Sequence, residues 1–184
     1  MRITGGELRG RRLHTPASKY LRPALERVRE AIFNILGPRL DGARVLDSFA
    51  GTGLLGLECL SRGSAFVTFV ELHKPTSRHL AALLPAWGLE ERARLIVGDF
   101  LRVAPRLAED GPYDVVFVDP PYPKGLIDRS LEIVAQCKLV APDGRVVAKQ
   151  HHKEALVAPV GLSIVDQRTY GDSKVTFLTA RDTT

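Results

Sequence analysis

The fold is decided by residues 45–56, which read VLDSFAGTGLLG. An apolar run ends in an acid and leads into a glycine-rich turn, after which a helix-like apolar segment begins. Gly51, Gly53 and Gly56 have the G-x-G-x-x-G spacing, which lets a ligand approach the backbone at the carboxyl end of a strand. That spacing alone is weak. Glu71 strengthens it, because a carboxylate about 20 residues beyond the turn can accept hydrogen bonds from ribose hydroxyls. Together these residues indicate a nucleoside-containing cofactor.

Asp47 indicates which cofactor the turn takes. Its carboxylate would lie where a dinucleotide fold needs room for an anionic pyrophosphate, and like charges repel. S-adenosylmethionine instead brings a sulfonium and an ammonium group, for which a carboxylate is an attractive partner, directly or through water. The pattern D-x-x-x-G-x-G therefore favours a methyltransferase over a nicotinamide-dependent oxidoreductase, the alternative from another class of enzyme.

Strand-like and helix-like segments alternate through the middle of the chain. Short runs of Val, Ile, Leu and Phe predict strands at residues 43–48, 66–71, 94–98, 114–119 and 144–149. Helical patterns predict helices near residues 53–62, 74–84, 100–109 and 126–139, with Pro85 and Gly88 ending the second of these early. Successive βα units of this kind predict an α/β fold with a Rossmann-like, doubly wound and mostly parallel sheet.

Both ends of the chain depart from this alternation. Residues 2–13 predict a short basic hairpin around a glycine pair. A helix is expected from Ala24 to Leu36, with an apolar face of Leu25, Val28, Ile32, Ile35 and Leu36. Near the C-terminus, Leu162 to Val165 and Val175 to Leu178 predict two strands joined by residues 168–172 without a helix. This antiparallel pair would complete a seven-stranded sheet.

Asp99 and Phe100 follow the third predicted strand. We expect Asp99 to accept a hydrogen bond from an adenine amino group and Phe100 to pack on the adenine ring. Asp99 could also serve only as the N-cap of the next helix, because Asp is favoured there. Glu71 has a similar alternative as a solvated strand end, although its spacing from the glycine turn favours binding.

The segment Asp119-Pro120-Pro121-Tyr122 is the strongest local motif in the sequence. Two prolines set a rigid, non-helical turn at the end of an apolar strand. An exocyclic amino group on a base is a poor nucleophile, so a catalyst must orient its lone pair toward the methyl carbon. The Asp119 carboxylate and the Pro120 carbonyl can accept the two N–H bonds, and Tyr122 can stack on a base extruded from its helix. A Pro-Pro turn with a helix-capping Asp is the structural alternative.

The net charge of +5 is concentrated in the N-terminal part of the chain. Residues 1–29 carry +6, and the other 155 residues carry −1. A basic segment on a near-neutral body is typical of a protein that binds a polyanion, most often nucleic acid, although a solvated charged surface has the same composition. We expect RNA contacts from Arg9, Arg11, Arg12 and Arg22. Arg27 and Arg29 are expected to form a solvated helix face.

Length and composition limit the remaining possibilities. The 184 residues, 45% of them hydrophobic and 26% charged, predict a single domain with a basic extension over residues 1–40 and a catalytic core over residues 41–184. No signal peptide and no membrane span of about 20 apolar residues are recognised, which predicts a cytoplasmic protein. Cys59 and Cys137 are expected to be buried thiols. Neither they nor the histidines show metal-ligand spacing, so no metal site is predicted.

Several segments resemble one known family. RITGG (2–6), RGRRL (9–13), Arg22-Pro23 and RVREAIFNIL (27–36) are similar to the N-terminal signature of RsmD enzymes, as are LSRGSA (60–65) and RTYGD (168–172). The D-P-P-Y motif resembles the amino-methylating branch of class I methyltransferases, which act on DNA adenine, RNA guanine or protein glutamine. Nearly the whole chain is covered by the resemblance.

The RsmD resemblance implies a substrate and a cofactor. RsmD enzymes methylate the N2 amino group of a guanine in 16S rRNA of the assembling small ribosomal subunit. The implied cofactor is S-adenosylmethionine, with S-adenosylhomocysteine as product, and it is carried over onto Asp47, Gly51, Gly53, Glu71 and Asp99. The catalytic loop is Asp119–Tyr122. We expect no membrane partner and a monomer. A methyltransferase acting on DNA or protein, or a noncatalytic RNA-binding protein on the same scaffold, remain alternatives.

Overall fold

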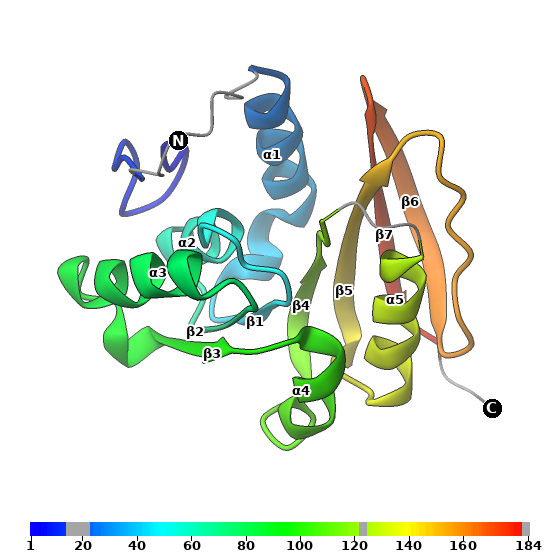
Figure 1. Cartoon of the computed structure of the whole chain (residues 1–184). Helices are drawn as coiled ribbons and strands as arrows, with labels where there is room; N and C mark the ends of the chain where they lie inside the picture. The colour runs from blue at the N-terminus through cyan, green and yellow to red at the C-terminus, as the bar shows by residue number, and fades with distance from the viewer. Residues whose placement is uncertain (14–22, 122–124, 182–184) are drawn as a thin grey trace.

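The computed structural model describes residues 1–13, 23–121 and 125–181, in which helices and strands alternate along the chain (Figure 1). The helices are α1 (Pro23–Leu36), α2 (Leu54–Ser61), α3 (Lys74–Ala86), α4 (Phe100–Leu107) and α5 (Leu126–Gln136), with 3-10 turns η1 (Gly37–Leu40) and η2 (Glu90–Arg92). The strands are β1 (Arg44–Asp47), β2 (Phe66–Glu71), β3 (Ala93–Val97), β4 (Tyr113–Val118), β5 (Val140–His151), β6 (Leu162–Tyr170) and β7 (Ser173–Ala180).

The strands form one seven-stranded sheet in the order β3-β2-β1-β4-β5-β7-β6. The first five pair in parallel, and β7 runs antiparallel to both β5 and β6. The carboxyl ends of the parallel strands therefore meet at one edge of the sheet, where open α/β folds bind their ligands. The α/β class, the mostly parallel sheet and its antiparallel C-terminal completion are confirmed.

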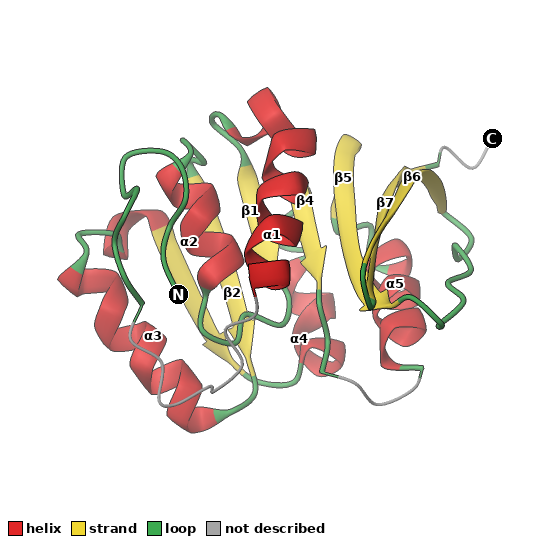
Figure 2. Ribbon diagram, turned by 90° about the horizontal axis from the view of Figure 1, so that it is seen from above, coloured by secondary structure: helices red, strands yellow, loops and turns green. Residues whose placement is uncertain are grey.

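Two helical layers cover the sheet because its central strands are apolar on both faces. Val45 and Val115 pack against α1, α2 and α3, whereas Leu46 and Val116 pack against α4 and α5. Figure 2 shows α1, α2 and α3 on one side of the sheet and α4 and α5 on the other. This arrangement leaves the carboxyl edge of the sheet free for a site.

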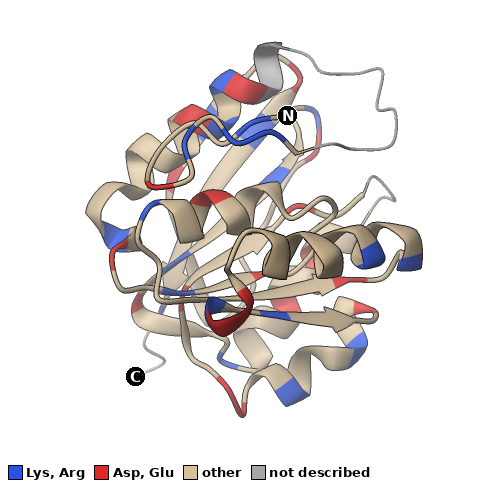
Figure 3. Ribbon diagram, turned by 90° about the vertical axis from the view of Figure 1, so that its left-hand side faces the viewer, with Lys and Arg blue, Asp and Glu red and all other residues tan. Residues whose placement is uncertain are grey.

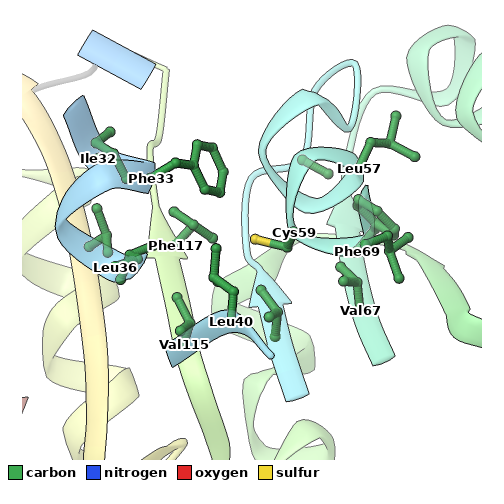
Figure 4. Close-up of a cluster of buried hydrophobic side chains, with 14 of the residues drawn as sticks. Ile32, Phe33, Leu36, Leu40, Leu57, Cys59, Val67, Phe69, Val115 and Phe117 are labelled. Atoms are coloured by element: carbon green, nitrogen blue, oxygen red, sulfur yellow. The ribbon is translucent and has the colours of Figure 1, made fainter. Parts of the chain in front are cut away.

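Helix α1 belongs to the core although it precedes the βα units. Ile32, Phe33 and Leu36 point toward Phe117 of the central strand β4 (Figure 4). The rings of Phe33 and Phe117 lie 6.1 Å apart. Ile35, which the helical spacing placed on the same apolar face, is 41% exposed. The buried face of α1 is therefore turned slightly from the one the sequence pattern predicts.

The predicted N-terminal hairpin is reduced to a single antiparallel bridge between Arg2 and Arg12. The backbone N–H groups that a longer hairpin would pair donate instead to α2. Thr4 and Gly5 donate to the Glu58 carboxylate, and Glu7 donates to the Ser61 carbonyl at 2.8 Å. Because these bonds use the donors of Thr4, Gly5 and Glu7, the segment forms a loop docked on α2.

Three smaller expectations also change. Pro85 lies inside the last turn of α3, which continues to Ala86 rather than ending early. Residues 168–170 belong to β6, so only Gly171 and Asp172 connect β6 to β7. Cys59 is fully buried as expected, but Cys137 is only half-buried because it forms the C-cap of α5.

In the part of the chain that the structure describes, no helix is long and apolar enough to cross a membrane.

Candidate functional site

A cavity of about 890 Å³ opens at the carboxyl edge of the sheet. Its walls come from the glycine turn after β1, the segments that follow β2, β3 and β4, the end of β5, and α1 with the first residues of the chain. The volume lies within the range usual for sites that take small molecules. Leu126 and Arg129 of α5 also line the cavity, so residues that are far apart in the sequence contribute to one site.

The glycine turn forms the floor of this cavity. Gly51 and Gly53 have φ values of +54° and +80°, which side-chain-bearing residues rarely adopt. The Gly51 backbone N–H donates to Glu71 Oε2 at 2.6 Å, which ties the turn to the end of β2. Gly56 lies one turn into α2, where a Cβ atom would overlap the ring of Phe69. Glycine at this position lets the helix sit close on the sheet.

Asp47 lies behind the turn and is not among the residues that line the cavity. Its side chain is 1% exposed and accepts a hydrogen bond from the Gly56 N–H at 3.1 Å. The pKa of Asp47 is raised to about 7, mainly by burial and also by the neighbouring carboxylates of Asp119 and Glu71, while the Gly56 hydrogen bond opposes the shift. The structure therefore connects Asp47 to the start of α2 and leaves the cavity wall to residues 48–52, 54 and 55.

The raised pKa of Asp47 predicts a pH-dependent stability. The folded protein binds the proton of the Asp47 carboxyl group more tightly than the unfolded chain does, so protonated Asp47 stabilises the fold. This stabilisation is complete below about pH 4 and is lost as pH rises to about 7. Asp47→Asn removes the titration. In urea unfolding at several pH values, we expect wild-type stability to fall relative to the variant by on the order of 1 kcal/mol per pH unit across this window. Parallel curves for the two proteins would contradict this assignment.

Glu71 and Asp99 both line the cavity. Glu71 Oε2 accepts from Gly51, and Oε1 accepts from the His73 N–H at 2.6 Å. Asp99 caps α4 by accepting from the Leu101 N–H at 3.0 Å. The capping alternative for Asp99 is thus present in the structure, together with a position at the cavity wall.

The aromatic and apolar wall differs in part from the prediction. Phe100 touches the cavity but is only 2% exposed, and its ring packs edge-on against Phe49 at 5.5 Å. Leu72, directly after Glu71, lines the same cavity and is 66% exposed. Phe49 and Leu72 were missed by the sequence reasoning. A leucine directly after a strand-terminal acid was the indication for Leu72 that the sequence offered.

Asp119 directly follows β4, the strand that pairs with β1 and therefore ends next to the glycine turn. It lines the cavity together with Pro120 and Pro121, whereas Tyr122 lies outside the described residues. Lys149 Nζ lies 2.7 Å from both carboxylate oxygens of Asp119. The sequence reasoning missed Lys149, although a lysine directly after the apolar run Val146–Ala148, at the carboxyl end of the predicted strand, was an available indication.

The N-terminal segment lies beside this cavity and exposes basic residues. Arg9, Arg11 and Arg12 are all exposed, and Arg11 lies over the Trp87 ring at 5.3 Å. Figure 3 shows the blue basic positions running along this segment. Arg22 lies outside the described residues.

A buried carboxylate, Glu58 of α2, fastens the N-terminal segment to the core. It is 0% exposed and accepts hydrogen bonds from Thr4 Oγ1, from Arg62 Nε and from the N–H groups of Thr4 and Gly5. Arg29 Nε lies 3.8 Å away, and an Arg29 terminal nitrogen donates to the Arg2 carbonyl. The expectation that Arg29 belongs to a solvated helix face is therefore wrong, because Arg29 is 7% exposed and faces this acid.

His151, His152 and Asp172 form a second group of potential ligands, with one ligand atom from each lying within 4.8 Å of the others. The two rings lie 4.5 Å apart and are inclined by only 32°, so they stack rather than converge on one point. His151 Nδ1 already accepts a hydrogen bond from the Lys153 N–H. This geometry does not resemble a tetrahedral metal site.

Comparison with known proteins agrees with the resemblance seen in the sequence. The profile of the family described as Conserved hypothetical protein 95 matches residues 1–179. Ribosomal RNA small subunit methyltransferase D of Escherichia coli is 35% identical over 173 residues, which are 93% of this chain and 85% of the relative. The protein of the same name from Haemophilus influenzae is 32% identical and covers 93% and 89%.

The solved structures show the same relationship. A hypothetical protein of Thermus thermophilus superposes with a TM-score of 0.80 at 31% identity, covering 96% of this chain and 98% of that one. Sequence, fold and chain length thus agree over nearly the whole protein, and the chain belongs to the family described as Conserved hypothetical protein 95, the RsmD family.

Proposed function

We propose that this protein transfers a methyl group from S-adenosylmethionine to the exocyclic N2 of a guanine in 16S rRNA. One observation carries the proposal: the Asp119-Pro120-Pro121 turn and the glycine turn with Glu71 open on one cavity, beside an exposed basic segment. The Asp119-Pro120-Pro121 turn can hold an amino group, and the glycine turn with Glu71 can hold a nucleoside. The basic segment can bind a phosphate backbone. Relatives named as ribosomal RNA small subunit methyltransferase D support rRNA as the substrate.

The residues around the glycine turn fit a nucleoside cofactor. Each Glu71 oxygen accepts one backbone N–H, which leaves each a further lone pair for a ribose hydroxyl. Leu72 and Phe49 would cover the adenine faces, and Asp99 would accept from its amino group. We propose that Gly51 and Gly53 admit the cofactor close to the backbone and that buried Asp47 favours its cationic end through the turn. S-adenosylmethionine supplies the activated methyl group.

Asp119 and Pro120 would orient the target amino group. Their oxygens accept its two N–H bonds, which points the nitrogen lone pair toward the methyl group, and Tyr122 would stack on the flipped base. After transfer, the Asp119 carboxylate would compensate the positive charge on the nitrogen until the nitrogen releases one proton to the carboxylate or to solvent, and S-adenosylhomocysteine would leave. The chain's contribution is therefore positioning and charge compensation.

Arg9, Arg11, Arg12 and Arg22 would contact the RNA backbone and position the enzyme. Such contacts carry little sequence information, so the base itself would be read in the cavity. We propose that the protein acts as a monomer on the assembling small subunit.

The salt dependence of RNA binding tests the basic segment. The association constant for RNA falls as the salt concentration rises, and the steepness of this fall on logarithmic axes counts the neutralised phosphates. Replacing Arg9, Arg11 and Arg12 by Ala should lower the magnitude of this slope by about 0.7 for each phosphate that the variant no longer neutralises. Arg106, Lys138 and Arg181 are exposed at the opposite edge of the sheet, so their replacement by Ala is the matched control and should leave the slope unchanged. Equal effects of the two triple variants would argue against this RNA surface.

The activity is tested by transfer of a labelled methyl group from S-adenosylmethionine to unmodified small subunits and to naked 16S rRNA. The modified nucleoside is then identified by mass spectrometry. N2-methylguanosine is the expected product. Comparing transfer to the small subunit with transfer to naked 16S rRNA shows which substrate the enzyme accepts. Cofactor binding without transfer to either RNA would instead favour a DNA or protein target.

A further inference from the structure

The strongest unassigned feature of the cavity is the contact between Lys149 and Asp119. Both side chains line the cavity, and they remain 21% and 31% exposed. The Lys149 ammonium approaches both carboxylate oxygens at 2.7 Å. Among the described residues, no other cation forms an ion pair with Asp119.

The fold directs Lys149 to this place. On β5, Val147 faces the layer of α1 and Ala148 faces the layer of α5, so Lys149 returns to the α1 side. The pairing of Ala148 with Val118 brings Lys149 next to Asp119 at the carboxyl edge. The lysine therefore points into the cavity rather than along the protein surface.

The pair presents a defined set of hydrogen-bonding groups. An ammonium has three N–H donors, and a carboxylate oxygen has two lone pairs. Lys149 uses two of its three N–H donors for the two oxygens of Asp119. One N–H of Lys149 and one lone pair on each Asp119 oxygen therefore stay available. A planar ligand in the cavity would therefore meet two acceptors and, beside them, one donor.

We infer that Lys149 and Asp119 together read the Watson–Crick edge of guanine, with Lys149 donating to O6. That edge offers two donors, the N2 amino group and N1–H, followed by one acceptor, O6, which complements the pair in the same order. This inference rests on the proposed function and assigns to it a specificity-determining residue. Flipped bases are commonly read by hydrogen bonds to this edge.

Other bases match the pair less completely. Adenine offers its amino group and the N1 acceptor, so one Asp119 oxygen would find no donor. Cytosine offers a single amino donor beside N3, with the same result. An unpaired acceptor in a closed site costs affinity, so guanine is favoured.

The test compares guanosine with 6-thioguanosine at the methylated position of the RNA. The analogue keeps N1–H and the N2 amino group but replaces O6 by sulfur, a weaker acceptor. We expect wild-type kcat/KM to fall about 10-fold or more on the analogue, as for loss of a charge-assisted hydrogen bond. Lys149→Met should be slower on guanosine and lose little further on the analogue, whereas Lys149→Arg should recover the sensitivity to sulfur.

Lys153→Met is the matched control, because Lys153 is exposed just beyond the end of β5, and it should behave as the wild type. If Lys149→Met and the wild type lose the same factor on the analogue, Lys149 only positions Asp119 and the inference is overturned. If the wild type methylates the guanosine RNA and the 6-thioguanosine RNA equally well, this result alone overturns the inference. If the wild type methylates no guanine N2 at all, the proposed function fails as well.

Discussion

Replacing Asp119 by Ala should lower kcat by at least about 100-fold while the Kd for S-adenosylmethionine changes little. The carboxylate follows β4, whereas Glu71 and the glycine turn follow β2 and β1, so its removal affects the amino group that is methylated rather than the groups proposed to hold the cofactor. Single-turnover methyl transfer to RNA and calorimetric titration with the cofactor measure the two quantities separately.

Asp143→Ala is the control for this prediction. Asp143 is exposed near the amino end of β5, and its side chain makes no hydrogen bond to any residue that the structure describes. Asp119→Asn tests the role of charge, since it keeps one acceptor and should retain more activity than Asp119→Ala. Wild-type turnover by Asp119→Ala would exclude Asp119 from catalysis.

Replacing Glu58 by Ala should lower the free energy of unfolding by about 3–5 kcal/mol, the usual cost of removing one partner from a buried ion pair. The change leaves Arg29 buried without its carboxylate and the N–H groups of Thr4 and Gly5 without their acceptor. Residues 1–13 should then become sensitive to proteases, because this acid fastens them to α2. Urea unfolding and limited proteolysis measure both effects.

Glu132→Ala is the matched control, because Glu132 is an exposed acid in the middle of α5. It should change the free energy of unfolding by less than about 0.5 kcal/mol. A similarly small loss for Glu58→Ala would mean that the N-terminal segment is held mainly by its apolar residues Ile3, Leu8 and Leu13, which are buried.

The order of strands and helices could be predicted from the sequence because the spacing of apolar residues differs between strands and helices. Strand residues such as Val115 to Val118 are apolar on both faces, and the helices begin after glycine turns or capping acids such as Asp99. Element ends were less accurate. Pro85 was expected to stop α3, yet the helix continues to Ala86.

The candidate site was also largely visible in the sequence, because parallel strands bring their carboxyl ends to one edge. Glu71, Asp99 and Asp119 each end or follow a strand, and all three line the cavity. Asp47 follows the same rule but lies behind the turn, since the glycine turn itself occupies the space in front of it.

The sequence by itself thus determined the α/β class, the glycine turn and the acids at the strand ends, all of which depend on neighbours along the chain. Only the tertiary structure decided that Glu58 binds residues 4 and 5 and that Lys149 binds Asp119, because those contacts join residues 53–54 and 30 positions apart. It also decided that Arg29 is buried, since helical spacing places a side chain on a face but does not say what covers that face. Such pairings depend on how distant elements pack.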